Sequence, residues 1–125
     1  MTALGRTVWV IPGGHIPERS MGPEPEMTSY DLLCVLNTGD TDARLRMTVY
    51  YADDEPVGPY ELTVAARRVR QVCFNDLIDP QAMPLGMPYG VVIRADLPVV
   101  VQYVRQDTRQ AANALLSVIA FDADG

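Results

Sequence analysis

The chain has 125 residues, 48% of them hydrophobic and 21% charged, a balance that fits one folded domain spanning residues 1–125 and excludes a disordered chain. Ten Arg residues, no Lys and 16 acidic residues give a net charge of −6, which excludes the overall basic footprint of a nucleic-acid-binding protein. No apolar run reaches the roughly 18 residues of a membrane-spanning helix, and Arg6 and Pro12 interrupt the N-terminal apolar run. We therefore expect a cytoplasmic protein without membrane insertion.

Alternation with a period of two is the main pattern along the chain. In residues 43–52, ARLRMTVYYA, Leu45 and Val49 fall on one face while Arg44 and Arg46 fall on the other. Such alternation predicts a half-buried antiparallel strand.

Seven further apolar runs predict strands, at residues 6–11, 30–36, 60–64, 69–74, 89–95, 99–105 and 114–121. Clusters of Asn, Asp, Gly and Pro predict turns between most of them, including one at residues 96–98. Eight short strands that must bury one apolar face each predict an all-β fold, a single-domain eight-stranded antiparallel β-sandwich.

Two segments each admit two interpretations. Residues 108–120 hold good helix formers without Pro or Gly, so a helix is an alternative to a strand there. Residues 12–28 contain four Pro and three Gly, which exclude a regular helix or central strand. This long segment is either a stiff crossover between sheets or a functional loop.

Several segments carry a family resemblance: GRTVWVI at 5–11, GPEP at 22–25, YYADDEPVGPY at 50–60 and VVQYVRQDTRQAANALLS at 100–117. Together they resemble the sensory rhodopsin transducer family over residues 5–121. The resemblance implies an eight-stranded β-sandwich, assembly as a homotetramer, and contact with a membrane photoreceptor at its cytoplasmic face. It also implies suggested roles in binding sugars or related metabolites and in DNA binding.

One departure from the family pattern lies in the loop after the first strand. The family has an acidic residue before the loop glycine, whereas this chain reads Pro12-Gly13-Gly14-His15. If that carboxylate contributes to a ligand or partner site in the family, this chain has lost the contribution.

Trp9 and His15 are candidate ligand contacts. If Val8 and Val10 face the core, alternation places the Trp9 indole on the opposite surface, where it can stack on a sugar or contact another chain; the alternative is a core tryptophan. His15 is the only histidine and lacks Cys or a second His at ligand spacing, so no metal site is expected. In its Gly-flanked loop it is either an exposed residue or a ligand contact.

A polar string follows the apolar run at 99–104. Arg105, Asp107, Arg109 and Asn113 either pair with one another or line a ligand pocket or subunit interface. Asn75 is a further candidate ligand contact, with an Asx turn or a helix cap as the structural alternative.

Arg67, Arg68 and Arg70 form a basic cluster that is either a solvated face or a partner-binding site, since guanidinium groups bind carboxylates and phosphates. Cys34 and Cys73 are expected to be buried free thiols. No nucleophile–base pair, metal cluster or cofactor motif is visible, so we expect no catalytic residues, metal or cofactor, and a protein that is not an enzyme.

Two classes of function compete. The first is a non-enzymatic signalling protein that contacts a membrane photoreceptor or another protein partner. The second is a sensor that binds a sugar or small metabolite without a rhodopsin partner. Transcription-related DNA binding is a weaker third hypothesis, because four chains of −6 would carry a charge of −24 and would be repelled by nucleic acid overall.

Overall fold

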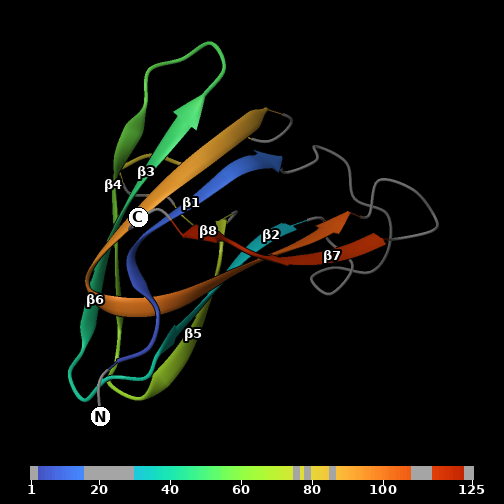
Figure 1. Cartoon of the computed structure of the whole chain (residues 1–125). Helices are drawn as coiled ribbons and strands as arrows, with labels where there is room; N and C mark the ends of the chain where they lie inside the picture. Colours follow the sequence, from blue (N-terminus) through green and yellow to red (C-terminus); the bar gives the residue numbers. More distant parts are fainter. Residues whose placement is uncertain are drawn as a thin grey trace.

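The computed structural model describes residues 3–15, 30–74, 77, 80–84, 87–107 and 114–122. These residues form strands that pair only in antiparallel fashion, and no α-helix occurs among them (Figure 1). In chain order the strands are β1 (Arg6–His15), β2 (Tyr30–Asn37), β3 (Ala43–Tyr51), β4 (Val57–Val64), β5 (Arg68–Cys73), β6 (Pro88–Asp107), β7 (Ala114–Ile119) and β8 (Phe121–Asp122).

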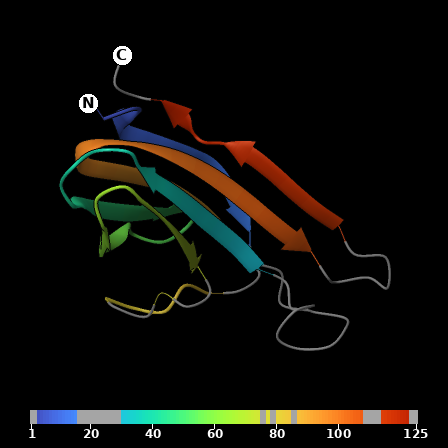
Figure 2. The same cartoon turned by 90° about the horizontal axis from the view of Figure 1, so that it is seen from below.

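The long strand β6 belongs to both halves of the fold. Its residues 88–95 pair with β1 and β3, and with β4 and β8 these strands make up what we call wing A. Its residues 100–107 pair with β2 and β7, and with β5 these make up wing B. Figure 2 shows β6 turning from one wing into the other, so that the wings face each other across the core.

The predicted all-β, antiparallel class is therefore confirmed, whereas a sandwich of two separate sheets is not, because β6 joins them. The turn predicted at residues 96–98 is wrong for the same reason. The β6–β3 ladder ends at Ala95 and pairing with β1 resumes at Val99. Pro98 lies between the two ladders, at a point where no backbone N–H is required for pairing.

Two other strands also tolerate proline through local irregularity. β1 continues through Pro12 to His15, although residues 12–15 were expected to be irregular; the register shifts between Ile11 and Gly14. β4 likewise contains Pro59 and begins at Val57, where its register against β3 shifts. Such bulges leave one residue outside the ladder, which removes the need for the donor that proline lacks.

The C-terminal strand prediction is confirmed over residues 114–119, where β7 forms in place of the alternative helix. Ala120 interrupts the predicted run, and its backbone N–H donates to the carbonyl of Val101 at 3.1 Å. Beyond it, β8 pairs with β1 in wing A. The last two described strands thus belong to different wings, β7 to wing B and β8 to wing A.

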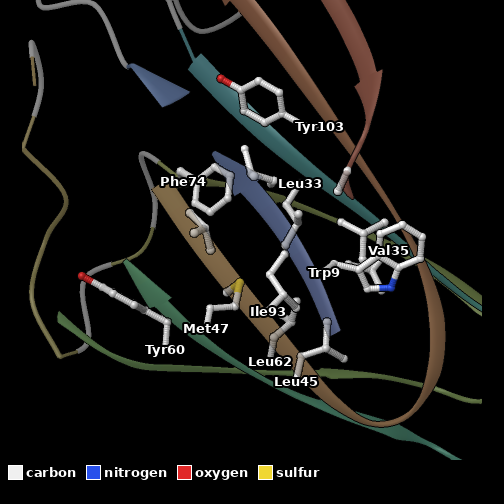
Figure 3. Packing of buried hydrophobic residues seen from close by; sticks show 14 of the residues in the cluster. Trp9, Leu33, Val35, Leu45, Met47, Tyr60, Leu62, Phe74, Ile93 and Tyr103 are labelled. Atoms are coloured by element: carbon white, nitrogen blue, oxygen red, sulfur yellow. The ribbon is translucent and has the colours of Figure 1, made fainter. Parts of the chain in front are cut away.

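The core lies between the wings, where side chains of alternate strand residues meet (Figure 3). On β3 the alternation is as predicted: Leu45, Met47 and Val49 are buried, and Arg44 and Arg46 are exposed. Buried residues from both wings complete the core, among them Leu33, Val35, Phe74, Ile93 and Val101.

Trp9 belongs to this core, so the expected surface position of its indole is wrong. Its side chain is 6% exposed and lies beside Val35 in Figure 3. The indole N–H donates to the carbonyl oxygens of Val99 at 2.9 Å and Arg6 at 3.1 Å. Because the ring is enclosed and its polar atom is used, Trp9 offers no face on which a sugar could stack.

Candidate functional site

A buried carboxyl group joins the two wings at one end of the molecule. Asp31, at the start of β2, is fully buried, since alternation points it inward together with Leu33 and Val35. The hydroxyl of Tyr89, at the start of β6 in wing A, donates a hydrogen bond to Asp31 Oδ2. The pair therefore links wing B to wing A across the core.

The ring of Tyr89 is fixed on two sides. Phe74 packs edge-on against it, with the ring centroids 5.6 Å apart and the planes at 61°. On the other side lies Gly14 of β1, where an added Cβ would come within 2.3 Å of the Tyr89 ring. Glycine is therefore required at position 14 by the close approach of this ring.

An open hollow of about 300 Å³ lies beside this pair, where β1 and β3 end and β6 begins. We call it the tyrosine hollow; its lining residues are Pro12, Gly13, Tyr50, Tyr51, Ala52, Pro88, Tyr89 and Gly90. Tyr50 is largely exposed. The hydroxyl oxygen of Tyr51 is buried and finds no hydrogen-bond partner among the described residues.

Burial and neighbouring groups keep these phenols protonated. Burial raises the pKa of Tyr51, and the negative charge of Asp54 raises it further. Burial also raises the pKa of Tyr60, and the electrostatic interaction with Tyr51 raises it further. The Tyr60 hydroxyl donates a hydrogen bond to the carbonyl of Gln81 at 2.6 Å. The tyrosine hollow thus combines aromatic and proline faces with a neutral hydroxyl that can still donate a hydrogen bond.

The strand ladders bring three predicted site positions to this same end. The His15 backbone lies opposite Pro88, Arg105 lies opposite Asp31, and Asp107 lies opposite Ala114. The side chains of these three residues fall outside the described part of the structure, as do Asn75, Arg109 and Asn113 entirely. Trp9, by contrast, belongs to the core and not to the tyrosine hollow.

Sequence reasoning missed Asp31, Tyr50, Tyr51 and Tyr89. Asp31 carried a usable signal, because a lone acidic residue in the run YDLLCVLN shares the inward face of an otherwise apolar strand. Nothing local identified Tyr89 as its partner, since the two residues are 58 positions apart.

The basic cluster lies where β4 of wing A is followed by β5 of wing B, at the opposite end of the molecule from the tyrosine hollow (Figure 1). Arg67, Arg68 and Arg70 are all exposed. Arg67 adopts a left-handed conformation, with φ of 55°, and its backbone N–H donates to the carbonyl of Gly39 at 3.1 Å. The Arg70 guanidinium donates to the carbonyl of Thr63 at 2.8 Å. We call these three residues the basic hairpin.

A buried amide holds the basic hairpin against the neighbouring turn. Asn37 is fully buried, and its side-chain N–H groups donate to the carbonyls of Thr41 at 2.9 Å and Val64 at 3.0 Å. Its side-chain oxygen accepts the Gly39 N–H at 2.9 Å. The arginines are therefore presented from a fixed backbone.

The outer face of wing B carries an apolar row. Leu36 of β2 is paired with Val69 of β5 and with Val100 of β6, and the side chains of Leu36 and Val69 are 42% and 61% exposed. Cys34 and Cys73 lie on the same face; neither forms a disulfide, as expected, but they are half-buried and not fully buried. Burial raises the pKa of the Cys34 thiol, and a hydrogen bond with Gln71 opposes the rise.

No helix among the described residues is long and apolar enough to cross a membrane. The described residues also contain no group of three or more His, Cys, Asp or Glu side chains that could hold a metal ion.

Comparison with known proteins identifies relatives over nearly the whole chain. The Anabaena sensory rhodopsin transducer family matches residues 4–122. A solved structure of the Anabaena sensory rhodopsin transducer is 48% identical, with a TM-score of 0.75 over 82% of this chain and 97% of its own. The crystal structure of Thermotoga maritima 1070 is 28% identical, with a TM-score of 0.83 over 97% of each chain. No curated protein matches the sequence. With its family match spanning residues 4–122, the chain belongs to the Anabaena sensory rhodopsin transducer family.

Proposed function

We propose that this protein is a non-enzymatic, cytoplasmic signalling protein that acts by binding the cytoplasmic face of a sensory rhodopsin. The observation that carries the proposal is the family match over residues 4–122, supported by 48% identity to a protein named as the transducer of such a receptor.

The basic hairpin is the surface that we assign to this contact. Three of the ten arginines of the chain lie within four residues of one another, all exposed, in a protein whose net charge is −6. Local positive charge on an acidic protein favours one orientation toward an acidic or phosphate-bearing surface. The hydrogen bonds of Asn37 and Gly39 keep this surface in place before binding, which lowers the ordering cost of association.

The outer face of wing B supports assembly as a homotetramer. Leu36, Val69 and Val100 form an apolar row across three neighbouring strands, and exposed apolar patches of this kind mark association surfaces. Alternation places Val69 on the opposite face of β5 from Arg68 and Arg70, so a tetramer that buries the apolar row can present several copies of the receptor-binding surface at once.

Binding to the Anabaena sensory rhodopsin in lipid nanodiscs tests the assignment. A variant with Arg67, Arg68 and Arg70 each changed to Gln should bind at least about tenfold more weakly, because a single lost hydrogen bond to a charged group costs about 1.5–3 kcal/mol. The matched control changes Arg44, Arg46 and Arg94 to Gln, which alters net charge equally on another face. Equal weakening by both variants would show a general charge effect and would remove the hairpin as the binding surface.

A small metabolite, with a sugar as the leading class, is the second candidate, and the tyrosine hollow favours it. Tyr50 offers an exposed ring, and the buried Tyr51 hydroxyl has no hydrogen-bond partner among the described residues. Sugars present apolar C–H faces to aromatic rings and hydroxyls to polar groups, which matches this lining.

A thermal melt against a sugar panel tests this second function. Ligand at 100 times its dissociation constant adds about 2.7 kcal/mol of stability, a rise in Tm of about 10 °C for a chain of this size. Tyr50→Ala should abolish the shift and Tyr51→Phe should reduce it. A panel that leaves Tm unchanged, or a shift that survives Tyr50→Ala, would rule out this site.

A further inference from the structure

Two arginines face each other on the outer surface of wing A. Arg46 of β3 and Arg94 of β6 are directly opposite in the antiparallel ladder, and both are exposed. Side chains at such positions have Cβ atoms only about 4.5–5.5 Å apart, and like charges there destabilise the sheet. An unliganded protein gains nothing from this arrangement.

The nearest acidic groups leave most of this charge unbalanced. Glu61 of β4 approaches Arg46, with Oε1 3.8 Å from Nε, but the two side chains are 72% and 67% exposed, so the contact contributes little. Asp96 Oδ1 accepts the backbone N–H of Arg44 at 2.8 Å. The Arg94 side chain has no hydrogen-bond or ion-pair partner among the described residues.

An open hollow of about 360 Å³ lies between the two guanidinium groups and the start of β4. Pro56, Gly58 and Pro59 form one side of it, and Thr48 adds a hydroxyl. β4 lies tightly against β3 here, since a Cβ on Gly58 would come within 2.8 Å of the Met47 carbonyl oxygen. This close contact between the strands fixes that wall.

The chemistry of the lining is one-sided. Arg46, Arg94 and Thr48 are its polar side chains, all of them hydrogen-bond donors, and no carboxylate takes part. In a chain with 16 acidic and ten basic residues, a hollow lined by two guanidinium groups and no carboxylate is complementary to an anion. Guanidinium groups bind oxyanions through paired N–H donors, a geometry that a single point charge does not supply.

We propose that this hollow binds the oxyanion group of a small molecule, a phosphate or a carboxylate, between Arg46 and Arg94, with the Thr48 hydroxyl as a third donor. The bound anion would offset the repulsion between the two arginines. Its lining shares no residue with the basic hairpin or the tyrosine hollow, and it does not depend on either proposed function.

Calorimetric titration of the 125-residue chain with inorganic phosphate and, separately, with succinate tests the proposal at constant ionic strength set by chloride. We expect saturable binding of at least one of them, and the tighter of the two identifies the source of the oxyanion. Arg94→Gln and Arg46→Gln should each weaken binding about tenfold. Arg44→Gln, an equal charge change at an exposed residue that does not line the hollow, should leave it unchanged.

Two further variants separate anion binding from a structural role. Glu61→Gln should tighten binding, because it removes the carboxylate that competes for Arg46. Without added anion, Arg94→Gln should leave Tm unchanged or raise it, since it removes like-charge repulsion. The proposal is overturned if neither anion binds saturably at millimolar concentration, if Arg44→Gln weakens binding as much as Arg94→Gln, or if Arg94→Gln lowers Tm.

Discussion

The hydrogen bond between Tyr89 and Asp31 provides a quantitative test of how the two wings are joined. Tyr89→Phe deletes only the hydroxyl that donates to Asp31. Both side chains are buried, so water cannot replace the lost donor. A buried polar group that loses a hydrogen-bond partner costs about 1–3 kcal/mol.

The expected shift in Tm follows from the size of the chain. At about 2.1 cal/mol/K per residue, 125 residues give an unfolding entropy of about 260 cal/mol/K, so that each kcal/mol lowers Tm by about 4 °C. Tyr89→Phe should therefore lower Tm by about 4–12 °C in scanning calorimetry. Tyr50→Phe is the matched control: it deletes a hydroxyl from an exposed tyrosine and should leave Tm unchanged.

A double-mutant cycle isolates the contact itself. If the hydroxyl acts through Asp31, then Tyr89→Phe should have a smaller effect in an Asp31→Asn background, with a coupling energy of about 1 kcal/mol or more. Effects that add to within about 0.3–0.5 kcal/mol would refute the reasoning. So would a Tm for Tyr89→Phe equal to that of the wild type.

Three other predictions concern the core, pH and assembly. Trp9→Phe removes the N–H that donates to the Val99 carbonyl at 2.9 Å and should destabilise the fold by about 1–3 kcal/mol in urea unfolding; unchanged stability would place the indole outside the core. The pKa of Tyr51 is raised in the folded protein, so the unfolded chain loses this proton first as pH rises. The stability that Tyr51 contributes is therefore complete below the ordinary tyrosine value of 10.0 and is lost as pH rises through the higher folded-state pKa. Tyr51→Phe should flatten that alkaline decline, and an identical decline in both proteins would contradict the assignment. Val69→Asp puts a charge into the apolar row of wing B and should shift the protein from the proposed tetramer to smaller species in size-exclusion chromatography with light scattering. A monomeric wild-type protein would contradict the proposed tetramer.

The parts of the fold that could be predicted are those governed by alternation alone. In β3 each apolar residue is buried and each arginine is exposed, because a strand with one face on the core must alternate. The position of Trp9 could not be decided this way, since Val8 and Val10 are apolar as well and both faces of β1 are partly covered. Burial of the larger ring, with its N–H bound by two carbonyls, decided the orientation.

Proline was misleading as a sign of turns. Pro12, Pro59 and Pro98 all lie inside strands, each where the register shifts or one ladder gives way to another. Such positions depend on which strands become neighbours, and this information is absent from any local run of sequence. The same limit applies to the site: the inward position of Asp31 follows from its strand, but its contact with Tyr89 requires the two wings to face each other.

The tyrosine hollow, the basic hairpin and the apolar row of wing B are the three surfaces assigned to the proposed functions. The tyrosine hollow lies at one end of wing A, and the basic hairpin lies at the opposite end, where β4 of wing A is followed by β5 of wing B (Figure 1). The apolar row belongs to wing B. A ligand in the tyrosine hollow could alter partner binding only by binding one of two states of the assembly more tightly than the other. The Asp31–Tyr89 bond, which joins the wings beside the hollow, is the described contact best placed to respond to such a ligand.

Receptor binding is the central claim, and equilibrium binding of the 125-residue chain to the Anabaena sensory rhodopsin in nanodiscs tests it most directly. The Anabaena sensory rhodopsin transducer, 48% identical to this chain, serves as the positive control and as the competitor. We predict saturable binding that the Anabaena transducer displaces. An absence of binding by this chain, under conditions in which the Anabaena transducer binds, would contradict the proposed function.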